Sequence, residues 1–155
     1  LKQIAETGKY DPALLEIYDD QLVASGSKLF AKRQQFLEVF TGIFNKHYRY
    51  LTDAAEVVQL VYDSPLVGQD FADLLRKSVE KDRALQRTTV GIHKDDLVFT
   101  IHEMPLKKFG SQGQQKSFLI ALKLAQYTYL DQQKGFRPLL LLDDIFDKLD
   151  DRRTR

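Results

Sequence analysis

The first third of the chain is dominated by apolar residues at helical spacing. Asp11-Pro12 can open a helix, because Asp caps helices and proline is favoured at the first helical position. An unbroken helix from Pro12 to about Leu51 would be about 60 Å long, at ~1.5 Å per residue. Ser25-Gly26-Ser27 contains weak helix formers, so we expect a kink or a break there. The apolar positions are Leu15, Tyr18, Leu22, Leu29, Phe36, Phe40, Ile43 and Leu51.

A helix of this length suggests a projecting arm or a helical hairpin, and two ordinary core helices are the alternative. The remaining pattern predicts a strand over 57–62, a helix over 70–86, a strand over 97–101 and a loop over 107–110. Ser111 then caps a helix that runs to about Gln133, and Gly135 stops it. The helix over 70–86 is amphipathic, with one apolar side formed by Phe71, Leu74, Leu75, Val79 and Leu85.

Composition narrows the classes of protein. The 155 residues suit one ordinary domain, and the 43% hydrophobic content is that of a globular protein. The longest apolar run, Leu139–Leu142, is far too short for a transmembrane helix. The absence of cysteine excludes disulfides, a thiolate zinc site and a cysteine nucleophile. A net charge of +1 gives no strong overall attraction to nucleic acid or membrane.

The ends of the sequence suggest a piece of a longer protein. The chain begins at Leu1 rather than Met, and it stops at Arg155, shortly after an apolar run and an acidic cluster. We therefore expect a fragment, and the alternative is an engineered chain whose leader was removed.

The run Leu139–Leu142 followed by Asp143-Asp144 has the form of a Walker B element. Four apolar residues predict a strand buried on both faces in the middle of a sheet, with the acidic pair at its carboxyl end. A carboxylate there can hold Mg²⁺, which prefers oxygen ligands, and a second carboxylate beside it can orient or deprotonate an attacking water. Alone this pattern is weak, because apolar runs followed by Asp occur at many strand ends.

A second element lies at Phe109–Lys116. A small-residue loop turns into a helix capped by Ser111, and backbone N–H groups there, with the Ser111 hydroxyl and the Gln114 amide, would suit a phosphate. A plain helix cap is the alternative. The same stretch misses the P-loop pattern by one residue, because Gln115 stands where glycine is required, so we reject a Walker A interpretation.

The order of these elements is more specific than either alone. A signature-like turn, Ser111-Gln112-Gly113-Gln114, precedes the Walker B-like run by some thirty residues, and Leu149-Asp150 follows as a D-loop would in an ABC-type ATPase. The sequence resembles the RecF family of bacterial recombination-mediator ATPases, which are related to SMC and Rad50 proteins. Further similarity lies in 91–97, where Ile92 and Lys94 depart from the family pattern, and in Tyr18–Leu22 with Gly26 and Arg33.

The resemblance implies an α/β fold, a partial ABC-ATPase head with a projecting helical arm. The arm would occupy 1–53, and 54–155 would be the signature and Walker B part of the head. The signature residues Ser111, Gln112, Gly113 and Gln114 would contact ATP bound to the other protomer. Asp143 would hold Mg²⁺, Asp144 would be catalytic, and Asp150 would lie in the D-loop at the dimer interface. The Walker A segment would lie before Leu1 and the switch histidine after Arg155, so the chain alone would not hydrolyse ATP.

The resemblance also implies partners and a location. The family forms an ATP-dependent homodimer, binds DNA at single-strand/double-strand junctions, and acts with RecO and RecR to load RecA at gaps during recombination and the SOS response. It is cytoplasmic and nucleoid-associated in bacteria, without a membrane partner. Two alternatives remain: the head of another SMC-like or Rad50-like ATPase, and a non-enzymatic DNA-binding or scaffold domain.

The remaining polar residues carry weaker expectations. His93 is better placed for a structural turn around Asp95-Asp96 than for catalysis, and the three histidines have no metal-site spacing. Three basic clusters could contact DNA phosphates, although ordinary solvated charges are the simpler interpretation. These clusters are Lys32-Arg33, Lys46 with Arg49, and Lys107-Lys108.

Overall fold

The computed structural model describes residues 12–54 and 56–141. The chain divides into two compact units. The first unit lies within Leu1–Gln35 and Tyr62–Asp96, and the second lies within Phe36–Val61 and Leu97–Arg155. The predicted division into an arm over 1–53 and a head over 54–155 does not coincide with these two units, and it stays a prediction.

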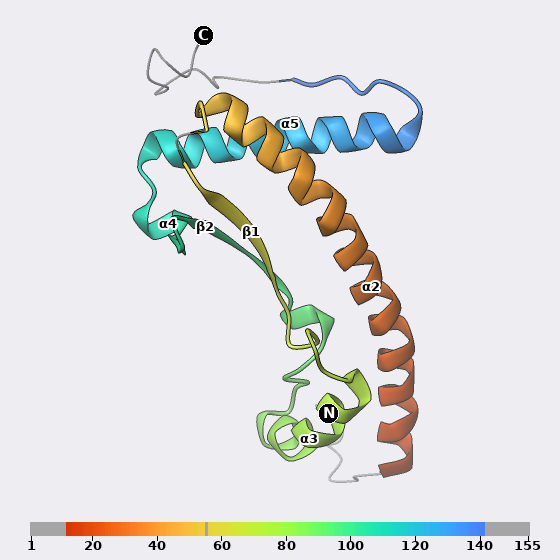
Figure 1. Cartoon of the computed structure of the whole chain (residues 1–155). Coiled ribbons are helices and arrows are strands. Elements are labelled where there is room, and N and C mark those ends of the chain that lie inside the picture. Colours follow the sequence, from red (N-terminus) through yellow and green to blue (C-terminus); the bar gives the residue numbers. More distant parts are fainter. Residues whose placement is uncertain (1–11, 55, 142–155) are drawn as a thin grey trace. The chain divides into compact units, whose positions relative to one another are not determined.

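One helix, α2 (Pro12–Leu51), contributes residues to both units. The expectation of a break at Ser25-Gly26-Ser27 is wrong, because α2 continues through these residues without interruption (Figure 1). Gly26 has a packing reason for being in the helix. A Cβ atom added there would lie 2.6 Å from Cε1 of Phe71, so only glycine lets this ring approach the backbone.

The first unit is held by α3 (Phe71–Leu85), which confirms the helix expected over 70–86. The side chain of Asp70 caps its start by accepting a hydrogen bond from the Asp73 amide at 2.9 Å. The predicted apolar side is confirmed at Phe71 and Leu75, which are buried, but not at Leu85, which is 48% exposed. The cluster consists of Leu66, Phe71 and Leu75, with Val23, Phe30, Leu74, Val90 and Ile92 packed against it.

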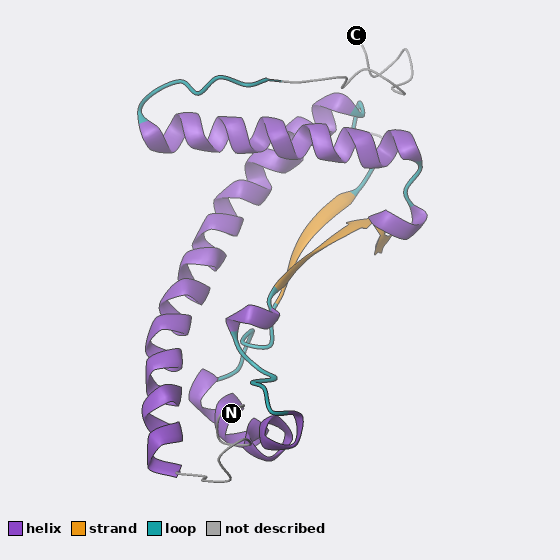
Figure 2. Cartoon of the chain, turned by 180° about the vertical axis from the view of Figure 1, so that it is seen from behind, coloured by secondary structure: helices purple, strands orange, loops and turns teal. Residues whose placement is uncertain are grey.

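The chain also forms a small β-sheet. Its strands β1 (Val58–Asp63) and β2 (Asp96–Ile101) confirm the two predicted strands within a residue or two. A third strand, β3 (Met104–Pro105), was not predicted, and it pairs antiparallel with β2 so that Thr100 lies opposite Pro105. The order is β1-β2-β3, and a short 3₁₀ helix, η1 (Ile92–Lys94), precedes β2 (Figure 2).

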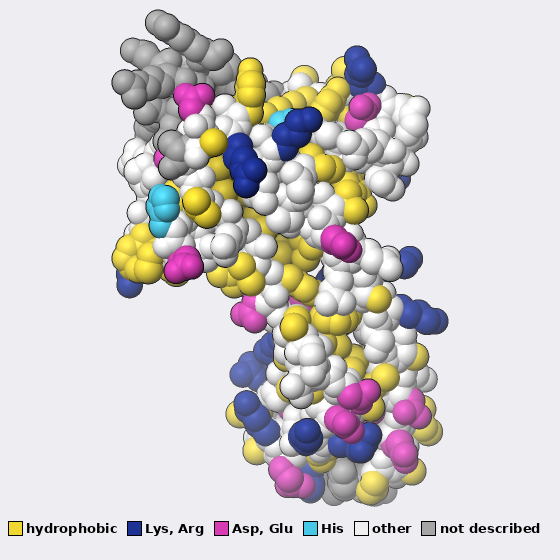
Figure 3. Space-filling view, in the orientation of Figure 1, with side chains coloured by type: hydrophobic (Ala, Val, Ile, Leu, Met, Phe, Trp, Pro, Cys, Tyr) yellow, Lys and Arg dark blue, Asp and Glu magenta, His cyan; other side chains and the backbone are white. Residues whose placement is uncertain are grey.

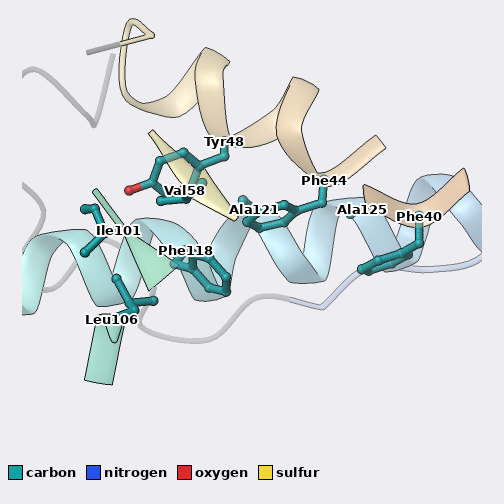
Figure 4. Packing of buried hydrophobic residues seen from close by; sticks show 9 residues of the cluster. All are labelled: Phe40, Phe44, Tyr48, Val58, Ile101, Leu106, Phe118, Ala121 and Ala125. Atoms are coloured by element: carbon teal, nitrogen blue, oxygen red, sulfur yellow. The ribbon is translucent and has the colours of Figure 1, made fainter. Parts of the chain in front are cut away.

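The core of the second unit joins α2, the sheet and α5 (Gln112–Lys134). The aromatic rings of Phe44 and Phe118 lie 4.7 Å apart between centroids, and Phe44 and Tyr48 are fully buried. Ala121 and Ala125 are also fully buried on α5, so the two helices can approach closely where the rings interlock (Figure 4). The cluster consists of Phe40, Phe44, Tyr48, Val58, Ile101, Leu106, Phe118, Ala121 and Ala125.

Two local expectations need correction. The loop predicted over 107–110 is instead a single helical turn, α4 (Leu106–Phe109), closed by the Gly110 amide donating to the Leu106 carbonyl. Leu139–Leu141 do not form a strand, and Leu139 and Leu141 are 94% and 92% exposed. An interior parallel strand needs a neighbour on each side, and no strand of the described sheet pairs with this segment.

We predict opposite effects for two glycine substitutions in α2. Gly42 has open space at its Cβ position, so Gly42→Ala should stabilise the chain by about 0.5–1 kcal/mol through helix propensity. Gly26→Ala should instead destabilise it by about 1–3 kcal/mol, because the added methyl group collides with Phe71. Thermal unfolding followed by circular dichroism measures both. A stabilised Gly26→Ala variant would contradict the close packing of Phe71.

Candidate nucleotide site at the start of helix α5

The first turn of α5 is fixed by a reciprocal pair of hydrogen bonds. The Ser111 hydroxyl accepts from the Gln114 amide at 3.2 Å, and the Gln114 side-chain oxygen accepts from the Ser111 amide at 2.8 Å. This is a capping box, which satisfies the N-cap amide and the amide of the third helical residue. The cap expected at Ser111 and the stop at Gly135 are both confirmed.

Gly110 makes the approach to this turn possible. A Cβ atom at this position would lie 2.7 Å from the Leu106 carbonyl oxygen and 2.8 Å from Leu106 Cδ1. A larger residue would therefore force α4 and α5 apart. The Gln115 side chain closes the same loop by donating to the Gly110 carbonyl at 2.8 Å.

A second polar link ties the turn to the core of the unit. The Gln114 side-chain nitrogen donates to Glu56 Oε1 at 3.2 Å, and the Tyr48 hydroxyl donates to Glu56 Oε2 at 2.5 Å. Glu56 and Tyr48 were not singled out from the sequence. Glu56 is 58 residues from Gln114, so no local motif could have indicated the contact.

The chemistry available at this turn is that of an anion site. Helix geometry leaves the first amides of α5 without intrahelical acceptors, and the helix dipole favours negative charge there. Ser111 and Gln112 are exposed, while Gly113 and Gln114 are half-buried. Both polar atoms of the Gln114 side chain are already hydrogen-bonded within the protein, so Gln114 shapes the turn in this arrangement. The backbone amides and the Ser111 hydroxyl remain the groups best placed for a phosphate.

The other predicted site residues cannot be placed beside this turn. Asp143, Asp144 and Asp150 lie outside the described residues. Among the residues that are described, no group of three or more His, Cys, Asp or Glu side chains could hold a metal ion. The assignments to Mg²⁺, catalysis and the D-loop therefore stay predictions.

The segment 91–97 carries a polar network within the first unit. Arg33 donates to the Ile92 carbonyl at 2.8 Å and forms an ion pair with Asp95 at 2.5 Å, and the Tyr62 hydroxyl also donates to Asp95. Burial raises the pKa of Asp95, but hydrogen bonds from Ser64, Tyr62 and Arg33 outweigh it, so that the pKa lies below its usual value. Arg33 thus has a structural role, which its position in a basic cluster did not indicate.

His93 and His47 each have a hydrogen-bond partner within the protein. His93 lies in η1, and its Nε2 atom is 3.0 Å from the Thr88 carbonyl oxygen, in agreement with the turn expected there. His47 Nε2 lies 2.9 Å from the Thr128 hydroxyl, and burial, assisted by the nearby Lys46 charge, lowers the pKa of His47.

On the face shown in Figure 3, Lys and Arg side chains are interspersed with Asp and Glu rather than gathered in one large patch.

The whole chain can be compared with known proteins. The chain is 55% identical over 154 residues to the DNA replication and repair protein RecF of Flavobacterium johnsoniae, covering 99% of this chain and 43% of that protein. It is 45% identical over 153 residues to the RecF of Cytophaga hutchinsonii, covering 99% of this chain and 41% of the other. A solved structure of the recombination mediator protein RecF with ATP superposes with a TM-score of 0.83 and 30% identity, covering 98% of this chain and 43% of that one.

This segment is of the RecF type. The match extends along nearly the whole chain, so the resemblance to RecF is confirmed. The fold is likewise that of part of a RecF ATPase, combining helices with a small sheet. The chain spans about two fifths of the length of the curated relatives it matches. No protein-family model matches the chain, and no helix in its described part is long and apolar enough to cross a membrane.

We predict that Asp95 stabilises the chain in a pH-dependent way. The side chain of Asp95 is only 3% exposed, so Asp95→Asn should lower the free energy of unfolding by about 1–3 kcal/mol at pH 7. Because the folded-state pKa of Asp95 is depressed, this contribution is present above the unfolded pKa of 3.8 and is lost as pH falls through the folded pKa. Urea unfolding between pH 7 and pH 3 should show the two proteins converging at the acid end.

Asp73→Asn is the matched control for this prediction. Asp73 pairs with Arg76 at 2.8 Å in the same unit, but both side chains are at least half exposed. Its removal should cost at most about 0.5 kcal/mol. An equal loss in the two variants, or a gap for Asp95→Asn that does not narrow at all between pH 5 and pH 3, would contradict the role assigned to the Asp95 network.

Proposed function

We propose that this chain is the part of a RecF-type ATP-dependent DNA repair protein that supplies the signature contacts of a shared nucleotide site. The signature residues Ser111, Gln112, Gly113 and Gln114 would contact ATP bound to the other protomer. ATP would thus join two heads, and hydrolysis would release them. The proposal rests on the RecF resemblance for the composite nature of the site.

The observation that carries this proposal is the state of the α5 turn. The capping box and Gly110 fix the turn through contacts within the chain, while Ser111 and Gln112 stay exposed. A preorganised helix start, whose first amides lack intrahelical acceptors, suits a phosphate presented by another molecule.

The remaining roles complete the catalytic cycle. Asp143 would hold the Mg²⁺ that accompanies ATP, Asp144 would activate the attacking water, and Asp150 would lie in the D-loop between protomers. A carboxylate is suited to the first two tasks, because it binds Mg²⁺ through oxygen and can accept a proton from water. The 155-residue chain alone should hydrolyse no ATP, because it contains no Walker A sequence.

The biological role follows the family. The ATP-bound dimer would bind DNA at single-strand/double-strand junctions and would act with RecO and RecR to load RecA at gaps. The protein would work in the bacterial cytoplasm, at the nucleoid. The solved relatives are described as recombination mediators in the RecFOR pathway, and this description supports the proposal.

We predict that Ser111→Arg in the full-length parent protein abolishes ATP-dependent dimerisation. The arginine would occupy the space in front of the helix start, whereas ATP binding by the same chain would persist because another lobe performs it. Analytical gel filtration with and without ATP measures the dimer, and a fluorescent ATP analogue measures binding. Ser27→Arg, the same substitution at an exposed position of α2, is the control. Normal dimerisation of Ser111→Arg would sink the composite-site proposal.

We further predict that Asp144→Asn in the full-length parent protein separates ATP binding from ATP hydrolysis. The amide keeps the size of the side chain but cannot accept the proton of an attacking water, so hydrolysis should slow by about a hundredfold or more while ATP binding persists. The ATP-bound dimer should therefore accumulate, as seen by gel filtration in ATP. Unchanged turnover would show that Asp144 has no catalytic role.

A further inference from the structure

Glu56 occupies a position between the core of the second unit and the signature turn. One carboxylate oxygen accepts from the Gln114 side chain at 3.2 Å, and the other accepts from the Tyr48 hydroxyl at 2.5 Å. Tyr48 is fully buried, and its ring lies 5.9 Å from that of Phe118 on α5. The carboxylate is therefore held from the core side and makes its second contact with the turn.

The chemistry of a carboxylate fixes which way the Gln114 amide faces. An ionised carboxylate can only accept hydrogen bonds, so the NH₂ group of Gln114 must face Glu56. The Gln114 oxygen is then directed to the Ser111 amide, where it accepts at 2.8 Å and completes the capping box. With the amide reversed, its oxygen would face the carboxylate and its NH₂ group would face the Ser111 N–H, and both contacts would be repulsive.

We propose that Glu56 is a positioning residue for the signature turn, acting through Gln114 and never touching the nucleotide. Its carboxylate selects the amide orientation that closes the capping box, and Tyr48 holds the carboxylate in place. The inference rests on the proposed function, because the turn matters for turnover only where Ser111–Gln114 act on ATP of another protomer. It adds a residue outside the signature motif to the machinery of the composite site.

Two substitutions at Glu56 separate hydrogen bonding from side-chain size. Glu56→Ala removes the hydrogen bonds to Gln114 and Tyr48 and should lower ATP turnover by the full-length dimer by about ten- to a hundredfold, because small misplacements of catalytic groups have effects of this size. Glu56→Gln keeps an oxygen that accepts from Gln114 and should recover most of the activity. Glu38→Ala, at an exposed glutamate of α2 in the same unit, should leave turnover unchanged.

Mixing two variants shows that the defect acts across the dimer. A Glu56→Ala protomer would keep its own nucleotide-binding face but present a defective signature, whereas an Asp143→Ala protomer would have the reverse defect. An equal mixture should recover about a quarter of wild-type turnover, because half of the dimers are mixed and each has one intact site. A misfolded Glu56→Ala protein would recover nothing. Mixing Ser111→Ala with Asp143→Ala provides the reference for a defect in the signature itself.

The outcomes distinguish this inference from the proposed function. Failure of the Ser111→Ala reference pair to recover would overturn the composite site, and this inference with it. Recovery of that pair, combined with wild-type turnover of Glu56→Ala or with no recovery in its mixture, would overturn the role of Glu56 alone. Amide hydrogen exchange in the 155-residue chain gives an independent measurement. The Ser111 amide should exchange at least several-fold faster in Glu56→Ala than in Glu38→Ala, and equal rates would contradict the inference.

Discussion

The packing of α2 against α5 is the interaction on which the second unit depends. Phe44 and Tyr48 from α2 meet Phe118 from α5 in a cluster of tilted and edge-on rings, the arrangement that aromatic quadrupoles favour. Ala121 and Ala125 leave room for these rings on the α5 side. The direction of α5, and so the place where its first amides emerge, is set by this hydrophobic contact rather than by polar groups at the site itself.

Polar contacts then refine what the core has placed. The Tyr48 ring belongs to the core, while its hydroxyl reaches Glu56 and, through it, Gln114. A chain of hydrogen bonds that begins at the fully buried Tyr48 thus orients the site. The first unit contains a comparable set of polar contacts, in which Arg33 binds both the Ile92 carbonyl and Asp95. Each unit therefore joins α2 to later segments through a buried or half-buried carboxylate.

The features that could be predicted from the sequence are those set by interactions between residues close together in the chain. The cap at Ser111, the stop at Gly135 and the helix 70–86 follow from side chains that bond or pack within one or two turns. Gly26 misled the prediction, because the residue that ordinarily weakens a helix serves here to admit Phe71 from another element. The links from Glu56 to Gln114 and from Arg33 to Asp95 join residues 58 and 62 positions apart, and no single-sequence pattern encodes them.

The run Leu139–Leu142 shows the opposite limit, in which a strong local pattern does not suffice. Four leucines bring hydrophobicity but not β-branching, and a strand also requires neighbours that accept and donate backbone hydrogen bonds. The described sheet consists of β1, β2 and β3, and Leu139 and Leu141 stay almost fully exposed instead of joining it. Apolar side chains left this exposed have a free energy to gain from any sheet that covers them. The side-chain and cap groups of the α5 turn are mostly hydrogen-bonded within the protein, and only the first amides of the helix still need an acceptor. The two halves of the proposed site therefore differ in kind: the signature is preorganised within this segment, whereas the Walker B run depends on neighbours that the described residues do not supply.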